Sequence, residues 1–277
     1  MSIEFLVCTI DKRIFQVQDL LMPPMPEVKY LISWQHSESM SCSDENSKLL
    51  TSLLESWNQR GDISLVEIDG RGLSRNRNHA LRHATGDFLV IADDDCRYTQ
   101  DCIQIIHRTF EKHPDAAAIQ FQGYTLEGKQ QRKYANYSYE YKQRPKFSYV
   151  ISWELVLNRK AQLPFFDERF GLGTDLCCGE EELFVHQISE SGQKIFYEPY
   201  KLVTTPEDTT GTHFADSVSV QRAKGGVLSL MHGSFGAMLR CLKFALFYPK
   251  VSFSTKASFM IEMFKGIVYV HTNHSVL

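Results

Sequence analysis

An apolar run that ends in three consecutive carboxylates constrains the fold of this chain more than any other segment. Residues 88–92 (Phe-Leu-Val-Ile-Ala) lead directly into Asp93, Asp94 and Asp95. Such a run is typical of a buried strand, and ligands of open α/β sheets bind at the carboxyl ends of strands. Neighbouring carboxylates repel one another unless a cation neutralises them, and Mg²⁺ and Mn²⁺ prefer oxygen ligands. The segment therefore predicts a metal site that handles an anion such as a diphosphate.

The first half of the chain alternates between strand and helix patterns, which predicts a Rossmann-like, mostly parallel sheet flanked by helices. The expected strands cover residues 3–8, 28–33, 64–68 and 88–93, and the expected helices cover residues 49–57, 74–84 and 100–113. Ser74 is expected to cap the second of these helices. The later segments are less regular: strands are expected over 117–124, 150–157 and 195–197, an edge hairpin over 134–141, a loop over 165–178 and a helix over 180–189.

Composition and charge indicate a globular protein with a distinct C-terminal segment. The chain has 277 residues, of which 43% are hydrophobic and 23% charged, and a net charge of −3 excludes nucleic acid as an expected partner. Residues 217–277 hold seven basic residues and one acid, Glu262, so they carry +6 and residues 1–216 carry −9. We therefore expect a catalytic domain over residues 1–216 and a basic, amphipathic, helical extension over residues 217–277.

Cysteine usage and the apolar segments indicate a cytoplasmic protein. The seven cysteines are odd in number and contain no CxxC pair, which argues against a disulfide framework and a zinc cluster. The N-terminus lacks the basic start and apolar stretch of a signal peptide. No segment reaches the roughly 18 uninterrupted apolar residues of a spanning helix.

A second candidate element is the cationic helix start Gly72-Leu73-Ser74-Arg75-Asn76-Arg77-Asn78. A helix N-terminus offers free N–H groups to anions, and arginine adds bidentate contacts to phosphate. Arg75 and Arg77 cannot both face inward on one helix, so we expect Arg77 and Asn78 to face the site. A solvated basic helix start is the alternative.

The third candidate element is the acidic helix start Gly179-Glu180-Glu181-Glu182. Carboxylates in a first turn are stabilised by the helix dipole, so a well-capped helix is one interpretation. The other is a general base, because a carboxylate that follows a glycine-rich loop can be held rigidly beside an attacking hydroxyl.

Together these segments and Phe166-Asp167-Glu168-Arg169-Phe170-Gly171 resemble glycosyltransferase family 2, over roughly residues 1–215. The resemblance implies the GT-A fold and an inverting transfer. It places Asp93 at the nucleotide ribose, Asp95 on the divalent metal and Asp94 between them. It also places Arg77 and Asn78 beside the nucleotide diphosphate. Glu181 falls on the position of the catalytic base, with Glu180 before it as the alternative.

Three positions depart from the pattern of that family. Thr9 and Asp11 follow the first strand where a Thr-x-Asn pattern is usual, and both remain able to touch the nucleotide base. Gln35 stands where many relatives place an aspartate, and it can hydrogen-bond uracil. The histidine usual near Val203 is missing, so the third metal ligand is either His213 or water.

The resemblance implies a metal-dependent enzyme that uses Mn²⁺ or Mg²⁺. Such an enzyme transfers a hexosyl or N-acetylhexosaminyl group from a nucleotide sugar, expected to be a UDP-sugar, to a hydroxyl of a sugar or lipid-linked acceptor. The implied setting is assembly of a bacterial surface polysaccharide or glycolipid. A sugar-1-phosphate nucleotidyltransferase and a catalytically silent carbohydrate-binding or scaffold relative are the alternatives.

The basic C-terminal segment interleaves aromatic and aliphatic residues with arginine and lysine. Amphipathic helices of this composition can lie on an anionic membrane surface, which here would be the inner face of the membrane. The same pattern also allows packing against the catalytic domain or a dimer interface.

Overall fold

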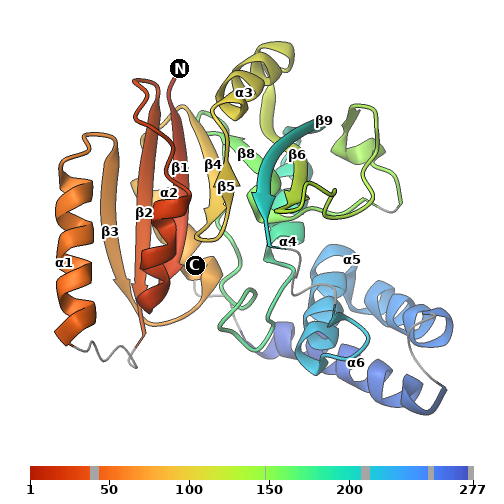
Figure 1. Cartoon of the computed structure of the whole chain (residues 1–277). Coiled ribbons are helices and arrows are strands. Elements are labelled where there is room, and N and C mark those ends of the chain that lie inside the picture. The colour runs from red at the N-terminus through yellow and green to blue at the C-terminus, as the bar shows by residue number, and fades with distance from the viewer. Residues whose placement is uncertain (38–43, 147, 207–212, 249–252, 274–277) are drawn as a thin grey trace. The chain divides into compact units, whose positions relative to one another are not determined.

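The structure, a computed structural model, describes residues 1–37, 44–146, 148–206, 213–248 and 253–273. The chain forms two compact units, each built from segments that are distant in sequence (Figure 1). The first comprises Met1–Arg71, Asn76–Pro164 and Ile188–Glu207, and the second comprises Gly72–Arg75, Phe165–Gln187 and Asp208–Leu277. The predicted division between residues 216 and 217 stays a prediction, since these units group residues 72–75 and 165–187 with the C-terminal helices.

The first unit contains a mixed sheet whose strands run in the order β3-β2-β1-β4-β8-β6-β9-β5, with β7 paired to β9. The strands are β1 (Ile3–Ile10), β2 (Val28–His36), β3 (Ile63–Asp69), β4 (Phe88–Asp93), β5 (Arg97–Tyr98), β6 (Ala116–Thr125), β7 (Tyr139–Glu140), β8 (Leu155–Asn158) and β9 (Lys194–Thr205). The helices are α1 (Asp44–Asn58), α2 (Leu73–His83), α3 (Asp101–Lys112), α4 (Glu180–Glu190), α5 (Val218–Phe247) and α6 (Lys256–Thr272). A 3-10 segment, η1 (Asp11–Asp19), follows β1 directly.

Four parallel strands, β3, β2, β1 and β4, form the half of the sheet that positions the acidic cluster. Apolar side chains on β1 and β4 are buried, as expected for parallel strands covered on both faces. The register pairs Cys8 with Asp93 and Ile10 with Gln35. The residues that end β1, β2 and β4 therefore lie at one edge of the sheet, as the sequence predicted.

A buried carboxylate on β1 closes the turn between α2 and β4. Glu4 accepts hydrogen bonds from the backbone N–H groups of Thr85 (2.6 Å) and Gly86 (2.7 Å). A Cβ on Gly86 would lie 2.5 Å from the Cβ of Glu4, so only glycine allows this approach. The turn thus fixes where β4 begins, and with it where Asp93 ends the strand.

Two predicted elements of the first unit differ from the structure. Residues 134–141 do not form a hairpin: only Tyr139 and Glu140 form a strand, which pairs with the distant β9. Residues 152–154 form a 3-10 turn before the short β8, because the buried carboxylate of Glu154 accepts hydrogen bonds from Gln120 (2.7 Å) and the Tyr134 hydroxyl (2.6 Å).

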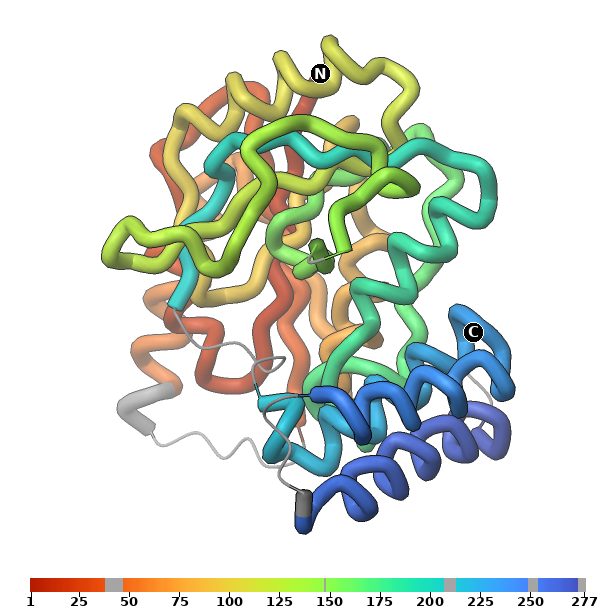
Figure 2. The backbone as a smooth tube through the Cα atoms, turned by 90° about the vertical axis from the view of Figure 1, so that its right-hand side faces the viewer, coloured from red at the N-terminus to blue at the C-terminus, as the bar shows by residue number. Residues whose placement is uncertain are grey.

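The second unit is built around helices α5 and α6, which lie side by side in both views (Figures 1 and 2). Two glycines permit a close crossing: a Cβ on Gly225 would lie 1.9 Å from the carbonyl oxygen of Met263, and one on Gly266 would lie 1.8 Å from that of Arg222. Helix α5 is kinked at Gly233, whose φ is 70°. Among the described residues, no helix is both long and apolar enough to cross a membrane.

We expect Gly225→Ala to destabilise the protein, because its methyl group cannot be placed without separating α5 from α6. Overpacking of this kind costs about 2 kcal/mol, which exceeds the gain of up to about 1 kcal/mol in helix propensity. The net loss of about 1 kcal/mol should appear in thermal unfolding as a Tm lower by about 2–4 °C. Gly236→Ala is the matched control, since its Cβ would meet only His232 and Arg240 side-chain atoms at 3.3 Å and 3.4 Å. Equal Tm values for the two variants would contradict the proposed crossing.

Candidate functional site

Asp94 is the buried member of the acidic cluster and is only 3% exposed. The Thr9 hydroxyl donates to its Oδ2 at 2.7 Å, and Arg13 Nε donates to both carboxylate oxygens at 2.9 Å and 3.0 Å. Burial raises the pKa of Asp94, and the hydrogen bonds from Arg13 and Thr9 oppose that effect. The carboxylate of Asp94 is thus taken up by contacts within the protein, and it fixes the loop that follows β4.

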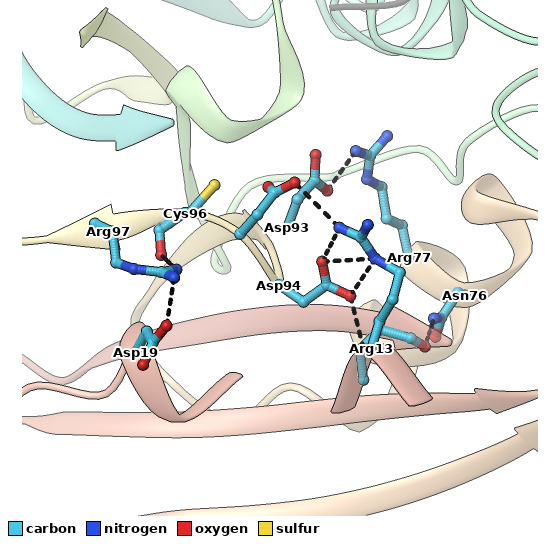
Figure 3. A network of polar contacts seen from close by, with 10 residues as sticks. Arg13, Asp19, Asn76, Arg77, Asp93, Asp94, Cys96 and Arg97 are labelled. Atoms are coloured by element: carbon cyan, nitrogen blue, oxygen red, sulfur yellow. Dashed lines mark hydrogen bonds and ion pairs between the residues drawn. The ribbon is translucent and has the colours of Figure 1, made fainter. Parts of the chain in front are cut away.

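Asp93 and Asp95 are more exposed than Asp94, and each contacts one arginine of the described residues. Figure 3 shows Asp93 and Asp94 among the arginines of this edge. Arg77 Nη2 donates to Asp93 Oδ1 at 2.8 Å, and Arg13 Nη2 donates to Asp95 Oδ2 at 3.1 Å. The three carboxylates outnumber these two guanidinium groups, so one negative charge remains in excess. Carboxylate oxygens of Asp93 and Asp95 remain partly accessible, and the local charge favours a cation beside them.

The N-terminal part of helix α2 turns its polar residues inward. Asn76, Arg77 and Asn78 are buried and Arg75 is exposed, which is the orientation that the sequence predicted for the two arginines. Asn76 Nδ2 donates to the carbonyl oxygen of Thr9 at 3.0 Å. This bond ties α2 to the end of β1, so Arg77 is held at a fixed place on the carboxyl edge of the sheet.

Asp11 joins the ends of β1 and β2. Its carboxylate accepts from the backbone N–H (2.8 Å) and the hydroxyl (2.5 Å) of Ser37, and its carbonyl accepts from Trp34 Nε1 at 3.0 Å. The φ of Asp11 is 48°, a left-handed conformation that aspartate tolerates better than most residues. These contacts fix the turn from β1 into η1, which is the segment that bears Arg13.

Gln35, at the end of β2, is 2% exposed. Its Nε2 is buried and has no hydrogen-bond partner among the residues that the structure describes. A buried donor without a partner costs about 1–3 kcal/mol of free energy, so a ligand acceptor at this position would be favoured.

The thiols next to the acidic cluster cannot act as nucleophiles at neutral pH. Burial raises the pKa of Cys8 to about 12 and raises the pKa of Cys96 well above its ordinary value. Both thiols therefore stay protonated, and the chemistry of this edge rests on carboxylates, arginines and amides.

The predicted catalytic acids belong to the second unit. Helix α4 begins at Glu180, which is buried, and Glu181 and Glu182 follow in its first turn with partial exposure. Lys224 Nζ donates to Glu182 at 3.2 Å. The free N–H groups and the dipole of a first turn favour ionised carboxylates there.

The loop before α4 is held rigidly, as a positioned base requires. A Cβ on Gly171, whose φ is 104°, would lie 2.9 Å from the Ser74 hydroxyl and 3.4 Å from Glu180 Cδ. Helix α2 begins at Leu73, so Ser74 lies inside its first turn instead of capping it, and its hydroxyl donates to the carbonyl oxygen of Phe170 at 2.6 Å. Ser74 thus anchors this loop through its hydrogen bond to Phe170.

His213, the predicted third metal ligand, is exposed and also belongs to the second unit. Within the described ranges, no group of three or more His, Cys, Asp or Glu side chains is arranged to hold a metal ion. The role of His213 as a metal ligand stays a prediction.

Comparisons with known proteins support the resemblance to a family and identify the fold. Residues 41–166 match the model of glycosyl transferase family 2. This part of the chain is similar to that family, and the chain has the GT-A fold. No curated protein matches the sequence.

Solved structures similar to this chain share its fold at low sequence identity. The structure of S. aureus TarS 1-349 in complex with UDP-GlcNAc has 13% identity and a TM-score of 0.61, covering 96% of this chain and 82% of that one. The mannosyltransferase PcManGT from Pyrobaculum calidifontis, in complex with GDP-Man and Mn²⁺, has 12% identity and a TM-score of 0.54, covering 97% and 87%. GalNAc-T7 with UDP, GalNAc and Mn²⁺ has 13% identity and a TM-score of 0.57, covering 100% and 58%.

The residues at the acidic edge fit a hard divalent cation. Mg²⁺ and related ions are commonly held by one or two carboxylates together with water and substrate phosphates. Asp93 and Asp95 supply two partly accessible carboxylates with a net negative charge around them. These carboxylates suit Mg²⁺ or Mn²⁺, which prefer oxygen ligands.

Sequence reasoning missed Arg13 and Asn76. Both hold the acidic edge together, since Arg13 contacts Asp94 and Asp95 and Asn76 fixes the end of β1. Arg13 had a detectable signal, because it lies directly after a strand whose carboxyl end was expected at the site. The sequence could not show that η1 returns this side chain to the aspartates.

Proposed function

We propose that this chain is a metal-dependent, inverting glycosyltransferase that transfers a hexosyl or N-acetylhexosaminyl group from a UDP-sugar to a hydroxyl group. The observation that carries the proposal is the pairing of buried Arg77 with partly accessible Asp93 beside Asp95, at the carboxyl edge of β1 and β4. A cation and a guanidinium at one edge are what the diphosphate of a nucleotide sugar requires.

The donor is proposed to bind along the ends of β1 and β2. Gln35 supports a uracil base, because its buried Nε2 can donate to a uracil carbonyl. Thr9 and Asp11 would line the base, and Asp93 would face the ribose. TarS structures hold UDP-GlcNAc or UDP and the GalNAc-T7 structure holds UDP, which favours a uridine nucleotide, whereas PcManGT is in complex with GDP-Man.

Asp95 and Asp93 would hold the divalent cation, with His213 or water as a further ligand. When bound, the cation would offset the charge that builds on the leaving diphosphate. Arg77 would add a second positive charge beside the same phosphates, and Asn78 would donate a hydrogen bond to them. Asp94 would act by holding the Asp93–Asp95 segment in place through Thr9 and Arg13.

Glu181 is proposed as the general base, with Glu180 as the alternative. It would take the proton from the acceptor hydroxyl as that oxygen attacks the anomeric carbon. Direct attack from the face opposite the leaving group inverts the anomeric configuration, so no nucleophilic side chain is required. The raised pKa of Cys8 agrees with a mechanism that has no covalent intermediate.

The acceptor is proposed to be a sugar or a lipid-linked sugar in the synthesis of a bacterial surface polysaccharide or glycolipid. The proposed setting is the cytoplasm, at the inner face of the membrane. Both statements follow from the resemblance to glycosyltransferase family 2.

The proposed reaction is tested by hydrolysis of the donor, in which water takes the place of the acceptor. Purified protein is incubated with a panel of UDP- and GDP-sugars in Mn²⁺, in EDTA, and in EDTA followed by excess Mn²⁺, and released nucleotide is measured. We expect slow release of UDP from at least one UDP-sugar, its loss in EDTA and its return with Mn²⁺.

The same assay separates the alternatives. A silent scaffold would release no nucleotide from any donor, and metal-independent release would contradict a role for Asp93 and Asp95. A sugar-1-phosphate nucleotidyltransferase would instead form UTP and sugar-1-phosphate when pyrophosphate is added.

A further inference from the structure

The second half of helix α5, residues 234–247, exposes its large apolar side chains. Phe235 is 71% exposed, Leu239 54% and Leu246 49%, and Met238, Leu242 and Phe247 are exposed as well. The packed face of this segment instead holds the small residues Ala237, Cys241 and Ala245, together with the partly buried Phe244. A core-packing helix buries its large apolar residues, whereas this segment exposes most of them.

The exposed residues form one continuous stripe. At about 100° per residue, Phe235, Leu239, Leu242 and Leu246 fall within an arc of about 60°, on the side away from Ala237, Cys241 and Ala245. On one side of this stripe, Lys243 lies about 40° beyond its edge and Arg240 about 100° beyond it. We call these six residues the α5 outer face: Phe235, Leu239, Arg240, Leu242, Lys243 and Leu246.

The charges around the α5 outer face indicate what kind of surface binds to it. Helix α5 contains no aspartate or glutamate. The single acid of α6, Glu262, is ion-paired with Arg222 (2.7 Å) and Lys265 (2.6 Å). Neither Arg240 nor Lys243 makes an ion pair with a residue that the structure describes. The positive charge beside the apolar stripe is therefore not neutralised by the described part of the chain.

We propose that the α5 outer face docks on the surface of an anionic phospholipid membrane. The helix would lie in the plane of the interface, with Phe235, Leu239, Leu242 and Leu246 inserted about 5–10 Å, to the level of the headgroups and upper acyl chains. Arg240 and Lys243 would contact lipid phosphates. A second copy of the chain would instead bring another basic face against them. The proposal does not depend on the transfer reaction proposed above.

The membrane proposal is tested by flotation of the full-length protein with vesicles of phosphatidylcholine containing about one third phosphatidylglycerol. We expect the protein to float with these vesicles and to bind vesicles of phosphatidylcholine alone at least tenfold more weakly. Leu239→Glu with Leu246→Glu should abolish binding, because it places two acids in the stripe. Arg240→Glu with Lys243→Glu should weaken binding at least tenfold, since each basic residue contributes about equally at an anionic surface.

Matched controls separate the α5 outer face from general effects of charge. Lys29→Glu with Lys142→Glu changes the net charge as much as Arg240→Glu with Lys243→Glu does, but at two exposed sites of the first unit. Leu126→Glu replaces an exposed apolar residue of that unit by an acid. Both should float as the wild type does. The α5 substitutions lie at exposed positions, so an unchanged Tm and an unchanged rate on a soluble donor will show that each variant is folded.

A spectroscopic readout reports insertion directly. Phe235→Trp should shift its fluorescence to shorter wavelength on adding anionic vesicles, whereas Leu126→Trp should not, and the three native tryptophans are buried. The proposal is overturned if the wild type ignores anionic vesicles. It is also overturned if Leu239→Glu with Leu246→Glu converts a dimer to a monomer without changing flotation, since the face would then bind a second copy.

Discussion

Replacing Glu181 by glutamine is expected to lower kcat about a thousandfold while the affinity for UDP stays within twofold of wild type. Glutamine keeps the shape of the side chain and removes its ability to accept a proton. Glu181 lies in the first turn of α4, where free N–H groups favour an ionised carboxylate. The loss should therefore fall on the chemical step, because the proposed donor contacts are made by the first unit.

The neighbouring glutamates supply the controls for this variant. Glu182→Gln makes the same change one residue further along, at a carboxylate that is ion-paired with Lys224, and its kcat should stay within twofold of wild type. Glu180→Gln tests whether Glu180, the alternative, is the general base instead of Glu181. Wild-type turnover in Glu181→Gln would remove Glu181 from the mechanism, and a simultaneous loss in Glu180→Gln would transfer the role to that residue.

The carboxyl edge of the first unit was predictable because its signals are local. The apolar run before Asp93 marks a strand end, and the parallel register then carries the ends of β1 and β2 to the same edge. The inward orientation of Arg77 followed from the geometry of a single helix.

Elements that depend on distant partners were not predictable in this way. Strand β7 is two residues long and exists only because it pairs with β9, more than 50 residues later. Strand β9 extends to Thr205, well beyond the predicted residues 195–197. The charged residue Glu198 made this segment resemble a loop in the sequence. In the structure its carboxylate is buried and accepts hydrogen bonds from Lys112 Nζ at 2.7 Å and from the Ser138 hydroxyl at 2.9 Å.

The electrostatic balance of the acidic cluster also required the structure. Sequence reasoning placed Asp94 between Asp93 and Asp95 and did not predict which residues of the protein it contacts. In the structure, Thr9 and Arg13 donate hydrogen bonds to the carboxylate of Asp94, whereas Asp93 and Asp95 stay partly accessible. The three-residue spacing of the buried Ile14 and Val17 fits the 3-10 segment η1, but it does not show that Arg13 reaches Asp94 and Asp95.

Asp95→Asn is expected to abolish the effect of a divalent cation on donor binding. Asp95 makes one ion pair, with Arg13, and the ion pair of Arg13 with Asp94 is unaffected by the change, so the fold of the loop should persist. Removal of one negative charge leaves the site without the excess charge that favours a cation. A bound cation would join Asp95 to the diphosphate, so its loss should appear as a loss of coupling between Mn²⁺ and UDP.

The most direct measurement is the affinity for UDP, by calorimetry, in the presence and absence of Mn²⁺ in the wild type, in Asp95→Asn and in Asp19→Asn. Asp19 is the matched control, because it is an exposed aspartate paired with Arg97 at 2.8 Å. We predict that Mn²⁺ tightens UDP binding at least tenfold, or about 1.4 kcal/mol, in the wild type and in Asp19→Asn, and less than twofold in Asp95→Asn. Equal UDP affinity with and without Mn²⁺ in the wild type, or an undiminished gain in Asp95→Asn, would contradict a cation-assisted diphosphate site at this edge.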